Sequence, residues 1–179
     1  MKPPNVPVRN HEVTFGEDEI IVSKTDLKGR IQYVNTIFMR VSGYSEAELL
    51  GEPHSIIRHP DMPRCVFKLL WDTIANGQEI FAYVKNMTKD GSFYWVLAHV
   101  TPTFDANGQV VGYHSNRRCP DRQQVEFFAN LYAQLLAEEQ RHSEWRTGMA
   151  SAAHILEQTL VQQGMGYEEL IFAGLAGRT

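Results

Sequence analysis

The chain has 179 residues, of which 43% are hydrophobic and 21% charged, and its 17 basic and 21 acidic side chains give a net charge of −4. This length suits one domain with extensions, and the composition is that of a globular protein. The slightly acidic balance provides no broad attraction to nucleic acid or anionic lipid, so we expect no nucleic-acid partner.

The cysteines and the hydropathy indicate that the protein is located in the cytoplasm. Cys65 and Cys119 are far apart and form no Cys-x-x-Cys pair, which is compatible with reduced thiols. No apolar run approaches the roughly 20 residues needed to cross a bilayer, and the start MKPPNVPVRN lacks the apolar stretch of a secretory signal. The sequence therefore predicts a cytoplasmic protein without direct membrane insertion.

The chain begins with an arm and then a hairpin. Residues 1–18 contain three prolines and several charges without a sustained period, so we interpret them as an N-terminal arm that is ordered in part by packing elsewhere. Two runs rich in β-branched residues follow, near 19–24 and 30–34, around the turn sequence Asp26-Leu27-Lys28-Gly29. These runs predict two paired strands.

Short helices come next. Asn35 stands at the N-cap position of a short helix that Gly43 would end. The sequence Ser45-Glu46-Ala47-Glu48 is a capping box and predicts one further turn of helix. Residues 52–63, EPHSIIRHPDMP, predict a structured loop, because Pro60 and Pro63 disfavour helical geometry in the residues before them.

A longer helix and three strands complete the central region. Apolar residues recur at helical spacing from Arg64 to a C-cap at Asn76-Gly77. Residues 79–88, 92–104 and 109–118 then predict three strands, joined by turns that contain Asp-Gly and Asn-Gly. Together with the first hairpin, this order predicts an α+β fold with an antiparallel meander.

The remainder of the chain favours helix. Residues 121–142 form an amphipathic pattern with one apolar face: Val125, Phe128, Leu131, Tyr132, Leu135 and Leu136. Two further segments, near 150–163 and 166–175, also favour helix. We therefore predict an N-terminal arm (1–18), a central domain (19–119) and a C-terminal helical extension (120–179).

The chemistry-bearing stretch is RHPDMP, residues 58–63. It offers a cation, a base and an acid, but the chain has no Gly-x-Ser-x-Gly, His-Glu-x-x-His or phosphate-binding glycine loop, so we expect no enzyme. The histidines are scattered and predict no metal site. A haem held by His54 or His59 stays open, since one axial histidine suffices.

The side chains of this stretch allow two further interpretations. Arg58 can pair with a phosphate or carboxylate of a cofactor, while Asp61 orients Arg58 or His59. Alternatively the loop is salt-bridged and only joins two helices. The residues alone do not decide between them.

The order of elements, with NTIFMRVSGYSEAELLGEPHSIIRHPDMP in its middle, resembles a PAS domain and more narrowly that of the bacterial aerotaxis (energy-taxis) receptors. The matching stretches are TDLKGRIQYVN, VSGYSEAELLGEPHSIIRHPDMP, VKNMTKDGSFYWV and GYHSNRR, within about residues 18–118. The pattern GxPHxxxRHPDMP is specific to the narrower family, whereas KNxxKDGxxYWV is common among PAS domains.

The resemblance implies a five-stranded antiparallel sheet with short helices on one face and a cofactor between them. In the aerotaxis receptors this cofactor is FAD, whose redox state reports respiratory electron flow. The family's cofactor-associated positions fall here on Asn35, His54, Arg58, His59, Asp61, Trp71 and Asn86. An apolar cavity with a few placed polar groups suits an isoalloxazine ring.

The chain departs from the family pattern in two places. Ile80 stands where family members often have a tryptophan, and this removes an aromatic surface that can stack on the flavin. The chain also stops at Thr179 without a transmembrane segment, and so resembles the stand-alone PAS proteins that act beside a membrane-bound chemotaxis transducer.

We therefore expect a cytoplasmic redox sensor that signals to such a transducer or its signalling region. The N-terminal arm and the C-terminal helices are the expected output elements and the expected contacts of a homodimer. A PAS module without cofactor that acts through protein contacts, and a haem-based gas sensor, are the alternatives.

Overall fold

A computed structural model describes residues 6–173, which form two compact units. The first contains the described part of Met1–His59 and Thr73–Pro120, and the second contains Pro60–Asp72 and the described part of Asp121–Thr179. Pro60–Asp72 belongs to the same unit as the described part of the C-terminal helices. Helix α3 (Arg64–Ala75) starts in the second unit and ends in the first.

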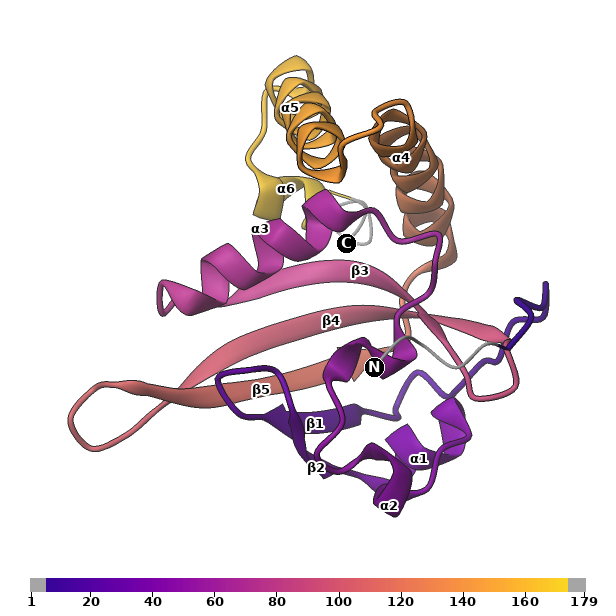
Figure 1. Ribbon diagram of the computed structural model, residues 1–179, viewed down its shortest axis with the longest axis vertical. Helices are drawn as coiled ribbons and strands as arrows, with labels where there is room; N and C mark the ends of the chain where they lie inside the picture. The colour runs from indigo at the N-terminus through magenta and orange to yellow at the C-terminus, as the bar shows by residue number, and fades with distance from the viewer. Residues whose placement is uncertain (1–5, 174–179) are drawn as a thin grey trace. The chain divides into compact units, whose positions relative to one another are not determined.

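A five-stranded antiparallel sheet forms the first unit, which confirms the predicted α+β class (Figure 1). The strand order is β2-β1-β5-β4-β3, and every neighbouring pair is antiparallel. The strands are β1 (Ile21–Thr25), β2 (Ile31–Val34), β3 (Ile80–Met87), β4 (Phe93–Phe104) and β5 (Val110–Arg118). The predicted hairpin and the predicted meander are both present, and each strand lies within two residues of its expected position.

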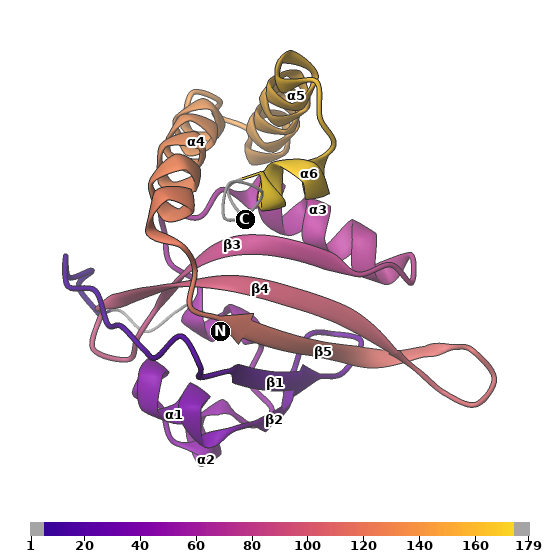
Figure 2. The same cartoon turned by 180° about the vertical axis from the view of Figure 1, so that it is seen from behind.

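Two short α-helices and one turn of 3-10 helix follow the first hairpin: α1 (Thr36–Ser42), α2 (Glu46–Leu49) and η1 (His54–Ile57). Helices α1 and α2 lie beside β1 and β2 in both views of the molecule (Figures 1 and 2). Gly43 ends α1 with a φ of 76°, a left-handed conformation that favours glycine. The predicted capping box between Ser45 and Glu48 is present, so the caps fix where these short helices start and stop.

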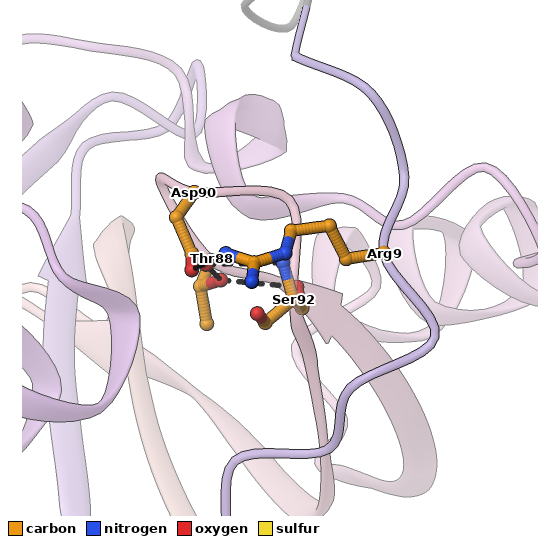
Figure 3. Close-up of polar contacts among 4 residues, drawn as sticks. All are labelled: Arg9, Thr88, Asp90 and Ser92. Carbon is orange, nitrogen blue, oxygen red and sulfur yellow. Dashed lines mark hydrogen bonds and ion pairs between the residues drawn. The ribbon is translucent and has the colours of Figure 1, made fainter.

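The N-terminal arm adds to the first unit as an extended segment. The Arg9 N–H donates to the Gly91 carbonyl at 2.8 Å, and the Phe93 N–H donates to the His11 carbonyl at 2.9 Å. Arg9 also pairs with Asp90, whose carboxylate accepts from the Thr88 hydroxyl at 2.6 Å (Figure 3). The prediction that packing elsewhere orders the arm holds for its described part, while residues 1–5 lie outside the described residues.

Helices α4 (Arg122–Gln140), α5 (Trp145–Gln163) and α6 (Tyr167–Phe172) make up most of the second unit. Helices α4 and α5 lie side by side in Figures 1 and 2 and approach closely at Gly148, where an added Cβ would stand 2.4 Å from the Glu139 carbonyl oxygen. Helix α5 begins five residues before the predicted start. The Glu144 carboxylate caps it by accepting from the N–H groups of Arg146 and Thr147.

Glu139 joins two distant segments within the second unit. Its carboxylate accepts hydrogen bonds from the N–H groups of Arg64, at 3.0 Å, and Cys65, at 2.8 Å. These are among the first amides of α3, which have no partner within their own helix. The bonds are the physical reason why Pro60–Asp72 groups with the C-terminal helices.

No helix of the described residues is long and apolar enough to span a bilayer.

Candidate functional site

Strand register places several polar side chains on one face of the sheet. Asn86 stands opposite Tyr94 in the β3–β4 pair, and Ala98 stands opposite Arg117 in the β4–β5 pair. Directly paired residues share a face, and so do Tyr94 and Ala98, which are four residues apart in one strand. We call this side the Asn86 face; Ser23 belongs to it as well, because Ile21 pairs with Arg117.

The backbone of Arg58, at the start of the RHPD stretch, meets the edge of the sheet at Asn86. Arg58 forms an isolated antiparallel bridge with Asn86, and β3 is an edge strand. Asn86 itself is only 4% exposed. A carboxamide at that depth requires hydrogen-bond partners, so its placement beside the loop marks a position where a ligand edge can be recognised.

His54 lies at the centre of a polar cluster. Its Nε2 is 3.1 Å from the Ser23 hydroxyl and 3.2 Å from Nη2 of Arg117, and its ring stacks on Phe38 at 5.9 Å between centroids. The guanidinium has only donors, so we assign Nε2 as the acceptor and place the proton on Nδ1. An iron ion at Nε2 would displace these contacts.

The surroundings of His54 keep its ring neutral. Part of the residue is exposed, but protein atoms surround the ring, and this desolvation, reinforced by the positive charges of Arg117 and Arg58, lowers the pKa of His54 to about 3. The ring therefore accepts a hydrogen bond from Arg117 at neutral pH rather than repelling it.

His59 packs against an aromatic ring, and Asn35 forms hydrogen bonds with the backbone. His59 is 1% exposed and lies edge-on to the Phe93 ring at 6.0 Å between centroids. The Asn35 Oδ1 accepts from the N–H groups of Phe38 and Val22, each at 3.0 Å, and its Nδ2 donates to the Ile20 carbonyl at 2.8 Å. Asn35 is thus the predicted N-cap and also joins α1 to the segment that leads into β1.

Asp61 and Trp71 belong to the second unit, whereas the other predicted site residues belong to the first. Asp61 is exposed and Trp71 is half-buried. The structure therefore brings together His54, Arg58 and Asn86 within the first unit, with His59 next to Arg58 in the loop.

Ile80, at the position of the family's tryptophan, is 3% exposed and pairs with Val100.

Sequence reasoning missed three buried polar residues of the first unit: Tyr44, Tyr94 and Arg117. They are 6%, 0% and 2% exposed, and each has a side-chain polar atom without a hydrogen-bond partner among the described residues. Desolvation lowers the pKa of Arg117 to about 10, so the guanidinium stays protonated at neutral pH. Desolvation also raises the pKa of Tyr94, which keeps its hydroxyl neutral.

These residues fit a flavin. The ring of a flavin is largely apolar and carries carbonyl and N–H groups along one edge, so it requires a few buried donors and acceptors among apolar neighbours. The first unit offers this combination, with the Asn86 amide and the unpartnered Arg117 and Tyr94 atoms on one face.

Comparisons with known proteins agree with this architecture. The family described as the PAS fold matches residues 31–117. The aerotaxis receptor of Escherichia coli (strain K12) is 36% identical over 130 residues, which cover 73% of this chain and 26% of the receptor. The chain carries a PAS domain of the aerotaxis receptor family.

Another relative of this PAS domain is a regulatory protein by name. The nitrogen fixation regulatory protein of Klebsiella pneumoniae is 29% identical over 99 residues, or 55% of this chain and 20% of that protein. The chain therefore spans about a quarter or less of the length of these two relatives.

Solved structures resemble the fold of this PAS domain. The dark structure of the blue-light photoreceptor Aureochrome1 LOV is 26% identical with a TM-score of 0.53, and the match covers 68% of this chain and 84% of that one. A Light-Oxygen-Voltage domain studied with a flavin analogue has a TM-score of 0.55 at 21% identity, over 62% of this chain and 83% of the other.

Proposed function

We propose that this PAS domain binds FAD and acts as a cytoplasmic redox sensor for energy taxis, not as an enzyme. The observation that carries the proposal is the bridge between Arg58 and Asn86, which sets the first residue of the family's RHPD stretch beside a buried asparagine on the edge strand. Kinship with an aerotaxis receptor and the likeness to a domain studied with a flavin analogue support a flavin as the ligand.

A bound flavin would supply a ring that takes up electrons and protons. The chain's own residues would recognise that ring and respond to it. In this proposal the Asn86 amide contacts the polar edge of the ring, Arg58 meets charge on the dinucleotide, and neutral His54 holds Arg117 in place. His59 and Asn35 support the wall, while contacts from Asp61 and Trp71 stay predictions of the family resemblance.

The signal would leave through the sheet. Asn86 lies on β3, which pairs with β4 along its whole length, and β4 in turn pairs with β5. Strand β5 ends at Arg118, and α4 begins only four residues later at Arg122, with Asp121 as its N-cap. A change in hydrogen bonding at Asn86 can thus reach α4 through continuous backbone pairing and a short connection.

We further propose a membrane-bound chemotaxis transducer as the partner and a homodimer formed through the arm and the C-terminal helices. The apolar stripe of α4 is buried within the chain, with Phe128 and Leu135 both at 0% exposure. Other apolar side chains of the C-terminal helices are exposed, notably Trp145 at 49% and Val161 at 81%. These positions are the first to test by cross-linking between protomers.

Absorption spectroscopy of the purified protein tests the cofactor. We expect flavin bands near ~450 nm and release of FAD on denaturation, whereas haem would give a Soret band near ~410 nm. Arg58→Ala should weaken FAD binding, with Arg40→Ala, at an exposed position of α1, as the matched control. A colourless protein that takes up no FAD on reconstitution would contradict the proposal and leave a cofactor-free interaction module.

A further inference from the structure

Arg117 is a buried cation without an acidic partner in the part of the chain that the structure describes. It is 2% exposed; its Nε donates to the Ser115 hydroxyl at 3.0 Å, and its Nη2 donates to Ser23 and to Nε2 of His54. Nη1 has no hydrogen-bond partner, and no carboxylate among residues 6–173 pairs with the guanidinium. Burying a charge is costly unless a counter-charge or a strong acceptor compensates for it. The described residues thus leave one buried donor of Arg117 without an acceptor.

Two tyrosine hydroxyls share this condition. The hydroxyls of Tyr94 and Tyr44 are buried and have no hydrogen-bond partner among the described residues. Tyr94 interacts electrostatically with Arg117 and with Tyr44, so it is a neighbour of each and connects the two. Buried polar atoms are almost always satisfied, and three unsatisfied donors in one neighbourhood indicate an acceptor that comes from outside the chain.

The sheet beside Arg117 is lined by small side chains. The register sets Ala98 directly opposite Arg117 and Ala82 directly opposite Ala98, so the three residues form a row across β5, β4 and β3. Both alanines are buried, at 4% and 1% exposure. A row of methyl groups next to a guanidinium suits a flat apolar ring with an electron-rich edge.

We propose that Arg117, Tyr94 and Tyr44 bind the electron-rich carbonyl edge of a planar ring ligand and that Arg117 sets its redox potential. This inference rests on the proposed function, in which the ring is that of a flavin. A cation at the carbonyl edge stabilises the electron density that the ring gains on reduction, so it makes the midpoint potential less negative. The site has one unpartnered guanidinium nitrogen and two neutral hydroxyls, which suits single carbonyl oxygens better than a multiply charged phosphate.

Two ligand probes separate a ring contact from a phosphate contact. Riboflavin carries the ring without phosphates, and ADP carries phosphates without the ring. We expect Arg117→Met to lower riboflavin affinity about tenfold, since a hydrogen bond to a charged group is lost. ADP binding should not change. Arg118→Met, at the exposed neighbouring position, is the control for both probes. Loss of ADP binding with unchanged riboflavin binding would overturn the assignment.

Tyr94→Phe and Tyr44→Phe provide a test that does not depend on removing a charge. Each variant deletes a hydroxyl that has no hydrogen-bond partner within residues 6–173. We expect unchanged or higher thermal stability without ligand, together with weaker riboflavin binding. A merely structural hydroxyl would give the opposite result, a loss of ligand-free stability with unchanged binding.

The midpoint potential supplies the last readout. In Arg117→Met protein saturated with FAD, we expect a more negative potential than in the wild type, and Arg117→Lys should restore part of the difference. Flavin binding with unchanged affinity and potential in Arg117→Met would overturn this inference alone. A wild-type protein that binds neither riboflavin nor FAD would overturn both this inference and the proposed function.

Discussion

Nη2 of Arg117, on the last part of β5, lies 3.2 Å from Nε2 of His54, at the start of η1. The histidine must accept for this contact to be favourable, which requires a neutral ring. The contact therefore couples the protonation of His54 to the position of the buried Arg117 on the Asn86 face.

We expect the stability of the protein to fall in acid because of His54. The folded pKa of about 3 lies below the ordinary value of 6.5, so between these values the unfolded chain binds a proton that the folded chain does not. The free energy of unfolding is then highest above pH 6.5 and decreases as the pH falls towards 3, by up to about 1.4 kcal/mol per pH unit.

Urea unfolding at a series of pH values between 7 and ~4 measures this slope. His54→Gln keeps an amide that can serve Arg117 and should flatten the curve, whereas His11→Gln, at an exposed position of the arm, should leave it steep. Equal slopes for wild type and His54→Gln would show that another group controls the acid response.

A second prediction separates the structural role of Asn35 from a cofactor contact. Asn35→Ala loses the N-cap of α1 and two further backbone contacts and should cost about 1–2 kcal/mol in unfolding free energy. Asn35→Asp keeps the capping oxygens, loses only the Nδ2 donor, and should be less destabilising. If FAD affinity falls in Asn35→Asp while stability is retained, the amide contacts the cofactor directly.

A third prediction concerns the N-terminal arm. Gly91 has a φ of 89°, and a Cβ there would stand 2.1 Å from the Pro7 carbonyl oxygen, whereas Gly108 has a φ of 77° and open space around it. Both alanine variants strain the backbone, but only Gly91→Ala displaces the arm. Limited proteolysis should therefore cut the arm faster in Gly91→Ala alone. Equal cleavage rates in the two variants would mean that the arm does not depend on this approach.

A fourth prediction concerns the cap of α3. Glu139→Ala leaves the Arg64 and Cys65 amides without their acceptor and should destabilise the second unit by about 1–2 kcal/mol. Glu126→Ala, at an exposed position of α4, is the matched control.

Thiol labelling of Cys65 also reports the loss of the Glu139 cap. Burial, and after it the charge of Glu139, raises the pKa of the Cys65 thiol to about 12, which suppresses its reactivity. In a Cys119→Ser background, Glu139→Ala should accelerate labelling of Cys65, and Glu126→Ala should not. A labelling rate that ignores Glu139 would contradict the capping role.

The elements that local patterns define were predictable. Strand-like runs between turn sequences predicted the five strands. The caps at Asn35 and Ser45 predicted the short helices, because the groups that satisfy these helix ends lie within a few residues in sequence. The start of α5 was predicted five residues late, since glutamate is an uncommon N-cap and Glu144 gave no recognisable signal.

Contacts between distant segments could not be read in the same way. Alternation along β5 does place Tyr113, Ser115 and Arg117 on one face, but only the pairing with β1 and β4 shows that this face is buried at Arg117. The signal available in the sequence was an arginine in phase with a buried tyrosine. The sequence likewise did not distinguish Glu139 from the other acidic residues of an amphipathic helix, so its role as the cap of α3 could not be predicted.

The bond from the Cys65 amide to Glu139 spans 74 residues, and the whole of β3, β4 and β5 lies between its ends. During synthesis the start of α3 therefore leaves the ribosome long before its acceptor, while the sheet segments emerge in between. The C-terminal helices close this long loop last. A chain cut after Pro120 would reach the end of its sheet yet leave the first turn of α3 permanently uncapped, so a shortened sensor should be tested with residues 121–173 supplied as a separate chain.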